Sequence, residues 1–358
     1  MRKIVALIIL FLAVFPLPSL SAERGLFRIR YLFSINAAVS GQPFSSLKDI
    51  FIDSKRGELY ALDSGNRRVV ITDLEGVFLY QFRFEHSKIG PNPVGIIVAE
   101  DGAIYVAEPR KVVVLNYNGK YRNEMDLSTV PGSGEMLLQS IAIEGEKIYL
   151  GDVGGGRVAV VGTDGRFIAG FDWKGGKNIR LSMDDERMFV MDPAIFSVFR
   201  LDKEGSVIHR FGQVSSLPGG FSMLADFAVD RKNGRVLVLD SNRFMVIAFS
   251  REGNFLFEFG GPQMFSWPGT LAVDSSGRIY VFDGSQKIRV FEAIEEAPAV
   301  EEPASEGAAP PAAQEGAPKG GEAPHVVEKP APAEEPEEGV AAPLLPKEGE
   351  PEGALPSQ

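Results

Sequence analysis

The 358-residue chain contains no cysteine, and this absence removes several chemistries at once. Disulfide bonds, thiolate zinc sites, iron–sulfur clusters and cysteine nucleophiles are all excluded, as is a lipid-modified cysteine after an export signal. Histidine is almost as scarce, with three residues in the whole chain. His86, His209 and His325 share no spacing that would place two of them on one metal ion, so neither a His-based zinc or copper site nor a Ser–His–Asp triad is predicted.

The chain also lacks the excess of basic residues that nucleic-acid binding requires. Its net charge is -11, with 37 Lys and Arg against 48 Asp and Glu. Residues 295–358 alone contain fifteen Glu and three Lys, so the acidity belongs to this C-terminal segment. The rest is close to neutral and has no strongly basic footprint, so nucleic acid is not an expected partner.

No apolar run is long enough for a typical membrane span. The longest follows the basic start at Arg2 and Lys3 and covers the twelve residues Ile4–Phe15. A basic start, a short apolar run and small residues at Ser21 and Ala22 are the layout of a secretory signal peptide. We therefore predict a signal peptide at residues 1–22, an exported (periplasmic or secreted) product and no membrane span after its removal. An uncleaved anchor is the alternative, although a span needs about 20 apolar residues.

A five-residue apolar string that ends in an acidic residue recurs six times along the middle of the chain. Successive copies begin 45, 44, 40, 48 and 43 residues apart. Regular spacing of this kind is typical of a repeat architecture in which each copy is one supersecondary unit. The six copies are Leu59–Asp63, Ile104–Glu108, Ile148–Asp152, Met188–Asp192, Val236–Asp240 and Ile279–Asp283.

Each unit divides into four short runs of strand-forming residues that are separated by turns. Runs rich in Val, Ile, Phe and Tyr favour strands, and Gly in the turns permits the positive φ of a tight hairpin. Four antiparallel strands in a repeat of this length form one blade of a β-propeller. Six units therefore predict an all-β, six-bladed β-propeller. In the first unit the runs are 49–52, 59–62, 69–72 and 78–82.

The sixth unit is one strand short, and the chain supplies a spare strand elsewhere. Its third run, Ile288–Phe291, leads directly into the acidic tail, whereas the strand-like run Leu26–Phe33 precedes the first unit. We expect this N-terminal strand to complete the sixth blade and close the ring, because closure removes exposed sheet edges. A separate N-terminal flap would leave two edges unpaired. The predicted propeller occupies residues 23–294.

Two stretches of the repeat resemble the NHL repeat, at residues 271–283 (LAVDSSGRIYVFD) and 63–71 (DSGNRRVVI). The resemblance covers residues 44–291. It is weaker in the second unit and weakest in the fourth, where residues 192–197 contain no Arg. It implies a six-bladed propeller of the bacterial exported type. It implies no single activity, because NHL propellers include protein-binding, RNA-binding and enzymatic members.

The recurring acids admit two interpretations. They could form a ring of metal or substrate ligands, or each could cap its own turn and pair with a nearby base. We favour the structural interpretation, because a basic residue follows most of them within a few positions. The acids are Asp63, Glu108, Asp152, Asp192, Asp240 and Asp283, and the expected partners are Arg68, Lys111, Arg157, Arg243 and Lys287.

A second set of positions opens the innermost strand of each blade and should line the mouth of the central channel. Five of the six are polar, a composition that suits Ca²⁺ or a small polar ligand. Lactonase-type propellers have a channel calcium site of similar composition. A water-filled polar channel is the simpler expectation, since two of the side chains are too short to reach the axis. The six are Asp49, Gly95, Ser140, Asn178, Asp226 and Thr270, with Asp49, Asn178 and Asp226 as candidate metal ligands.

The loops between blades carry both tryptophans of the chain, Trp173 and Trp267, together with several basic residues. Aromatic and basic groups on one rigid face are typical of a binding surface. Packing between blades is the alternative for both tryptophans, because Trp is usually well buried. Phe44, Phe221 and Phe265 precede the inner strands and are expected to fill gaps between blades.

The C-terminal segment, residues 295–358, contains 13 of the 24 Pro and is expected to be a disordered, extended tail. These features favour an exported, non-catalytic binding or scaffold propeller. Its channel-mouth face would meet a protein, a peptide or a glycan, and no cofactor is needed beyond a possible Ca²⁺ ion. The alternative is a Ca²⁺-dependent hydrolase, lactonase or lyase with its site at the channel mouth, so enzymatic activity is left open.

Overall fold

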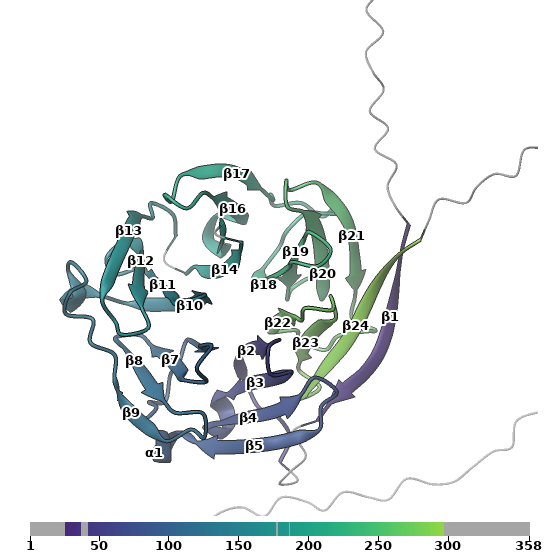
Figure 1. The fold of residues 1–358 in the computed structure, drawn as a ribbon. Coiled ribbons are helices and arrows are strands. Elements are labelled where there is room, and N and C mark those ends of the chain that lie inside the picture. Colours follow the sequence, from purple (N-terminus) through teal and green to yellow (C-terminus); the bar gives the residue numbers. More distant parts are fainter. Residues whose placement is uncertain (1–25, 37–41, 177, 186, 297–358) are drawn as a thin grey trace, which may run out of the picture. The chain divides into compact units, whose positions relative to one another are not determined.

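The computed structural model describes residues 26–36, 42–176, 178–185 and 187–296, and these form a six-bladed β-propeller. Six four-stranded antiparallel sheets are arranged in a ring around a central channel (Figure 1). The predicted fold class and number of blades are confirmed. The predicted signal peptide and most of the predicted tail lie outside the described residues. No helix in the described part of the chain is long and apolar enough to cross a membrane.

In blades 1 to 5 the four strands follow one another in chain order from the channel to the rim. Blade 1 contains β2 (Leu47–Asp53), β3 (Glu58–Asp63), β4 (Arg68–Asp73) and β5 (Phe78–Arg83). Blade 2 contains β6 (Gly95–Val98), β7 (Ile104–Glu108), β8 (Lys111–Leu115) and β9 (Tyr121–Glu124). Blade 3 contains β10 (Leu138–Glu144), β11 (Lys147–Asp152), β12 (Arg157–Gly162) and β13 (Phe167–Asp172).

Blade 4 contains β14 (Arg180–Asp184), β15 (Arg187–Asp192), β16 (Ser197–Leu201) and β17 (Val207–Phe211). Blade 5 contains β18 (Leu224–Asp230), β19 (Arg235–Asp240), β20 (Met245–Ser250) and β21 (Phe255–Gly260). A short helix, α1 (Phe84–Ser87), follows blade 1. In the described part of the chain, 3₁₀ turns occur at Ser64–Asn66, Ser133–Glu135 and Pro193–Ile195.

The middle strands of the blades are apolar on both faces because each blade is covered by a neighbour on either side. In blade 5, the residues from Val236 to Leu239 are completely buried, and so are Val246 to Ala248. Strands buried on both faces appear in the sequence as continuous apolar runs rather than as alternating ones. This burial explains why the recurring five-residue string is apolar throughout.

Blade 6 is built from both ends of the described chain. It contains β22 (Thr270–Val273), β23 (Ile279–Asp283), β24 (Lys287–Glu296) and, as its outer strand, β1 (Leu26–Ile35). The antiparallel pairing runs from Leu26 opposite Glu296 to Ile35 opposite Ile288, which confirms closure by the N-terminal strand (Figure 1). The boundary of the tail was placed two residues too early, because β24 continues through Glu295 and Glu296.

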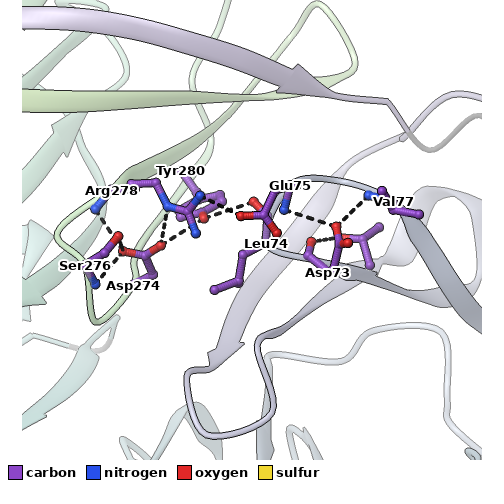
Figure 2. A network of polar contacts seen from close by, with 9 residues as sticks. Asp73, Leu74, Glu75, Val77, Asp274, Ser276, Arg278 and Tyr280 are labelled. Carbon is purple, nitrogen blue, oxygen red and sulfur yellow. Dashed lines mark hydrogen bonds and ion pairs between the residues drawn. The ribbon is translucent and has the colours of Figure 1, made fainter.

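A polar network supports the contact between blade 6 and blade 1 (Figure 2). Arg278 donates to Asp274 of its own blade at 2.6 Å and to Glu75 of blade 1 at 3.0 Å. The buried hydroxyl of Tyr280 donates to the Leu74 carbonyl at 3.2 Å and lies 3.0 Å from the Asp274 carboxylate. Burial alone would raise the pKa of Asp274, but hydrogen bonds from Ser276 and Arg278 lower it. The ring is therefore joined here by ion pairs as well as by apolar packing.

The antiparallel order of the strands gives the ring two distinct faces. The loops between blades and the loops between second and third strands lie at one face, which we call the loop end. The opposite face, which we call the turn end, carries the turns between first and second strands and between third and fourth strands. Hydrogen bonds from Ser45 to Asp63 and from Leu137 to Asp152 show the two kinds of loop in contact at the loop end.

Candidate functional site: the central channel and the loop end

Five of the six recurring acids accept a backbone amide from the loop that leads into their own blade, whereas Asp283 accepts from Ser285 and Arg289. Asp63 accepts from the Ser45 amide at 2.9 Å and from the Arg68 guanidinium at 2.9 Å, with both charged groups buried. Asp192 has no basic partner among the described residues and accepts from the backbone amides of Gly176 and Ala194. The structural interpretation of these acids agrees with these contacts.

Two of the expected basic partners were wrong. Asp240 accepts only backbone amides, from four residues including Arg243, while the Arg243 guanidinium pairs with Glu258 at 2.8 Å. Asp283 pairs with Arg289 at 3.0 Å rather than with Lys287. Lys287 is directly opposite Asp283 in the ladder, as Arg68 is opposite Asp63, but the pairing guanidinium comes from Arg289, two residues further along β24.

The position that opens each inner strand forms a polar ring in the channel, which we call the channel ring. Its members are defined by the register: each pairs with the residue that precedes a recurring acid. Asp49 is opposite Leu62, Ser140 is opposite Gly151 and Asp226 is opposite Leu239. The complete ring is Asp49, Gly95, Ser140, Arg180, Asp226 and Thr270.

The register corrects one member of the predicted ring. In blade 4, Arg180 and not Asn178 is opposite Met191, and Asn178 is an exposed residue before the strand. The cause is the turn between the first two strands of this blade. Asp184 pairs with Arg187, whereas the corresponding pair in blade 5 is Asp230 with Arg235. The shorter turn moves the start of the inner strand toward the recurring acid, so a cation replaces the expected amide.

Three ring side chains connect neighbouring blades by accepting a backbone amide from the next inner strand. Asp49 Oδ2 accepts from Ile96 at 2.9 Å, and Ser140 Oγ accepts from Leu181 at 3.0 Å. Asp226 Oδ2 accepts from Leu271 at 3.0 Å and from the Thr270 hydroxyl at 2.6 Å. Blades 1, 3 and 5 are each fastened to the following blade in this way.

The two ring carboxylates have raised pKa values. Burial, followed by repulsion from the Asp226 carboxylate, raises the pKa of Asp49 to about 7. Burial also raises the pKa of Asp226, and the positive charge of Arg180 partly offsets this. Gly95 leaves room for the Asp49 carboxylate, since a Cβ there would be 3.1 Å from Asp49 Oδ2 and 2.8 Å from Ile141. Near neutral pH the channel ring therefore contains a carboxyl group that is easily protonated or deprotonated.

Arg180 crosses the channel but forms no ion pair among the described residues. One of its Nη atoms donates to the Val94 carbonyl of blade 2 at 3.3 Å. Its charge lowers the pKa of both Asp49 and Asp226, yet neither carboxylate is within ion-pair distance of the guanidinium. Most of its N–H donors thus remain open to the channel. Sequence reasoning missed this residue, although a lone Arg between Ile179 and Leu181 was a visible signal.

The channel contains a cavity of about 620 Å³ lined by inner-strand residues of all six blades. The cavity extends from the channel ring toward the turn end, because its lining includes first-turn residues such as Ser54, Gly145 and Ser275. Among the residues that the structure describes, Val94 is the one loop-end residue in its lining. The ring therefore forms the inner end of the cavity rather than an open mouth on the loop end, as had been expected.

The two tryptophans have different environments. Trp173 is buried and packs edge-to-face against Phe199, so it belongs to the core between blades 3 and 4. Trp267 has 55% of its surface exposed. Its indole packs edge-to-face against Phe244 at 5.9 Å, and its Cβ is close to Gly284 of the same blade. Packing between blades is therefore the role of Trp173, and Trp267 is a surface group.

Other apolar side chains are exposed in the loops of the loop end. They lie on the loops of blades 4 and 5 and were not singled out in the sequence, because single exposed apolar residues in loops have no distinctive pattern. Phe44, Phe221 and Phe265 are fully buried and fill the positions predicted for them, and Phe84 is buried as well. The exposed residues are Ile195, Val214, Leu217, Met223 and Trp267, which we call the loop-end patch.

Within the described residues, no group of three or more His, Asp or Glu side chains is arranged to hold a metal ion. The ring combines two carboxylates with one guanidinium, so its charge is partly balanced without a metal. Ca²⁺ prefers six to eight oxygen ligands, and the described oxygens of Asp49 and Asp226 already accept backbone amides. This donor set fits Ca²⁺ poorly.

Comparison with known proteins gives the same fold. A family model described as a 6-bladed beta-propeller matches residues 176–292, which covers blades 4 to 6. No curated protein sequence matches the chain. Among solved structures, virginiamycin B lyase from Staphylococcus aureus is 13% identical, with a TM-score of 0.51 over 76% of this chain and 89% of that chain.

A luciferin-regenerating enzyme is likewise 13% identical, with a TM-score of 0.54 over 73% of this chain and 94% of its own. The WD40 propeller domain of Doa1 is 15% identical, with a TM-score of 0.50 over 70% of this chain and 80% of that chain. At these identities the likeness concerns the fold alone, since unrelated activities share one propeller architecture. The chain is a six-bladed β-propeller, and the NHL resemblance stays a prediction.

Proposed function

We propose that this chain is a binding propeller whose loop end holds a protein or peptide partner. The observation that supports the proposal is the exposed indole of Trp267, held against Phe244 at the loop end, where the loops of blades 4 and 5 also expose apolar side chains. Exposed apolar groups gathered on one face are typical of interaction sites, and Trp is enriched among the residues that dominate binding energy. The blades beneath are rigid, so little ordering is needed on binding.

Binding is favoured over the metal-dependent hydrolase alternative by the composition of the channel ring. Arg180 takes the place where an amide ligand was expected, and the carboxylates of Asp49 and Asp226 fasten neighbouring blades. Among the described residues, both carboxylates that could act in hydrolysis are engaged by backbone amides. A glycan partner would also suit an exposed Trp and is distinguished by the experiment below.

The experiment pans a random peptide-display library and a glycan array against the full chain and then compares variants. We expect selected peptides to lose at least ten-fold in affinity with Trp267→Ala, because truncating a central Trp costs about 2 kcal/mol or more. Tyr117→Ala is the matched control, since Tyr117 is exposed at the turn end. Equal losses in both variants, or binding only to glycans, would contradict a peptide-binding loop end.

We also propose that the protein is exported. The basis is the charge and apolar pattern of residues 1–22, which lie outside the described part of the chain. Mass spectrometry of protein recovered from the cell envelope or medium should show a mature N-terminus near Ala22 or Glu23. Retention of Met1 on the exported protein would favour an anchor instead.

A further inference from the structure

The central cavity has three zones of different chemistry along its length, which are the charged channel ring at its inner end, the wall of the inner strands and the outer rim at the turn end. At the inner end are the charged groups of the channel ring, Arg180 with Asp49 and Asp226. The wall beyond them carries apolar side chains, among them half-buried Phe51, Ile143 and Val273. The polar backbone edges of the inner strands lie between these side chains, because each inner strand is at the edge of its sheet. A ligand that fits all three zones needs charged groups at one end and an apolar body behind them.

Charged side chains at the outer rim form ion pairs with one another. Arg231 pairs with Glu144, and Arg231 Nη2 also donates to the Met183 carbonyl at 2.9 Å. Lys55 pairs with Glu100 at 3.3 Å. Lys232 donates to the Ser276 carbonyl at 2.7 Å and belongs to no ion pair among the described residues. The described rim therefore carries two internal ion pairs and one lysine, whereas the inner end carries charges of both signs that are not paired with each other.

The inner end offers opposite charges that are close but not in contact. The Arg180 guanidinium keeps open N–H donors, and among the described residues no ion pair joins it to Asp49 or Asp226. Asp49 Oδ2 accepts from the Ile96 amide, and the Ile50 amide also donates to this carboxylate, so its orientation is fixed. A carboxylate oxygen has two lone pairs and can accept a further donor. Separated and fixed opposite charges are complementary to a dipolar ion, whose carboxylate meets the guanidinium and whose ammonium meets the carboxylate.

We propose that the channel binds a free α-amino acid with a large apolar side chain. Its carboxylate accepts from Arg180, its ammonium donates to Asp49, and its side chain lies along the apolar wall. The cavity, at about 620 Å³, is within the usual size range for small-molecule sites. The site is separate from the loop-end patch, so the proposal goes beyond the partner binding proposed above and is tested independently of it.

The protonation of Asp49 adds a pH dependence to this binding. Burial and the neighbouring Asp226 raise the pKa of Asp49 to about 7, and Arg180 opposes this. The other channel-ring residues, Gly95, Ser140 and Thr270, carry no titratable group. An ammonium ion binds the ionised carboxylate, so affinity should rise as the pH increases from about 6 to about 8.

Isothermal titration calorimetry with the full chain tests the proposal, using L-phenylalanine and L-leucine as probes. Phenethylamine lacks the carboxylate and 3-phenylpropanoate lacks the ammonium. We expect both to bind at least ten-fold more weakly than L-phenylalanine, because each forfeits a charge-assisted hydrogen bond worth about 1.5–3 kcal/mol. Calcium chloride is titrated in parallel, because a divalent cation would compete for the same carboxylates.

Variants locate the site. Arg180→Gln and Asp49→Asn should each weaken L-phenylalanine binding at least ten-fold, and Asp49→Asn should also remove its pH dependence between pH 6 and 8. Arg122→Gln, at an exposed position on outer strand β9, is the matched control and should leave affinity unchanged. Thermal melting of each variant shows whether it is folded, and Arg180→Lys, which keeps the charge, should restore part of the affinity.

Three results would overturn the proposal. One is the absence of heat for both amino acids up to about 10 mM, which corresponds to a binding free energy weaker than about 3 kcal/mol. Another is equal binding of phenethylamine or 3-phenylpropanoate. The third is an unchanged affinity in folded Arg180→Gln. Because Trp267→Ala leaves the channel intact, failure of the channel proposal leaves the loop-end result unaffected, and the reverse also holds.

Discussion

At the residue scale, Asp49 has the clearest energetic signature in the molecule. Its native pKa of about 7 exceeds the ordinary value of 3.8, so the native state holds the proton more tightly than the unfolded chain. The native state therefore loses stability as the pH rises from about 4 to about 7. The full cost is present above that window and absent below it.

We predict that Asp49→Asn stabilises the protein at pH 8 and changes little at pH 4.5. The amide can still accept from Ile96 but carries no charge to bury. A gain of about 1–3 kcal/mol at pH 8 is expected, since one pKa unit corresponds to about 1.4 kcal/mol. Urea unfolding at both pH values measures it, with Glu146→Gln as an exposed control. A gain that is equal at both pH values would contradict the buried charge as its cause.

The recurring acids give a second residue-scale prediction. The loss of stability on replacing an acid by Ala should increase with the burial of its basic partner. Arg68 has 3% of its side chain exposed beside Asp63, whereas Lys111 has 35% exposed beside Glu108. Asp63→Ala removes the carboxylate that balances the charge of the buried Arg68 guanidinium and should cost about 3–5 kcal/mol. Glu108→Ala leaves a cation that water can reach and that still pairs with Glu124, so about 1 kcal/mol is expected. Denaturant unfolding of the two variants side by side tests the order, and equal costs would refute it.

At the scale of strands and turns, local patterns predicted more than long-range ones. The five-residue strings and the Gly-containing turns locate the strands, because strand and turn preferences act over a few residues. The channel ring depends on cross-strand register, which in blade 4 is set by a turn shorter than that of blade 5. The sequence pattern therefore predicted Asn178 at the channel-ring position that Arg180 occupies. The residues of the loop-end patch lie in loops that are far apart in sequence, so no periodic pattern in the sequence identifies the patch.

Strand β1 carries the next prediction. A chain that begins at residue 38 lacks the partner of β24 and should aggregate or melt at a markedly lower temperature, because a long edge with unpaired backbone groups is exposed. A chain that ends at residue 296 keeps both strands complete and should melt like the full protein. Scanning calorimetry compares the two. Unchanged melting of the chain that starts at residue 38 would mean that the ring does not depend on this strand.

At the scale of the whole molecule, the network around Arg278 adds an acid-sensitive contribution to the closed ring. The pKa of Asp274 is lowered in the native state, so its contribution is present above the ordinary value of 3.8 and is lost as the pH falls through the lower native value. Arg278→Met keeps the stem but removes the hydrogen bonds to Asp274 and Glu75. A loss of about 1–3 kcal/mol at pH 7 is expected, from a buried carboxylate left without its cation.

The same variant should lose less stability at pH 3, where Asp274 is closer to neutral in both proteins. Urea unfolding of wild type and Arg278→Met at pH 3 and pH 7 measures the difference. Arg200→Met, which removes an ion pair with Glu252 at 3.5 Å between blades 4 and 5, is the control away from the ring closure. A loss for Arg278→Met that is independent of pH would show that packing, not charge, explains its role.

The pairing of β1 with β24 also determines how the propeller responds to mechanical force. Leu26 is opposite Glu296, so the points at which the chain enters and leaves the propeller are adjacent at one end of the same strand pair (Figure 1). A force applied at these two points breaks the hydrogen bonds between β1 and β24 one after another, whereas a shearing force would load all of them at the same time. The strand that closes the ring at equilibrium would therefore be the first to separate under tension, and at low force.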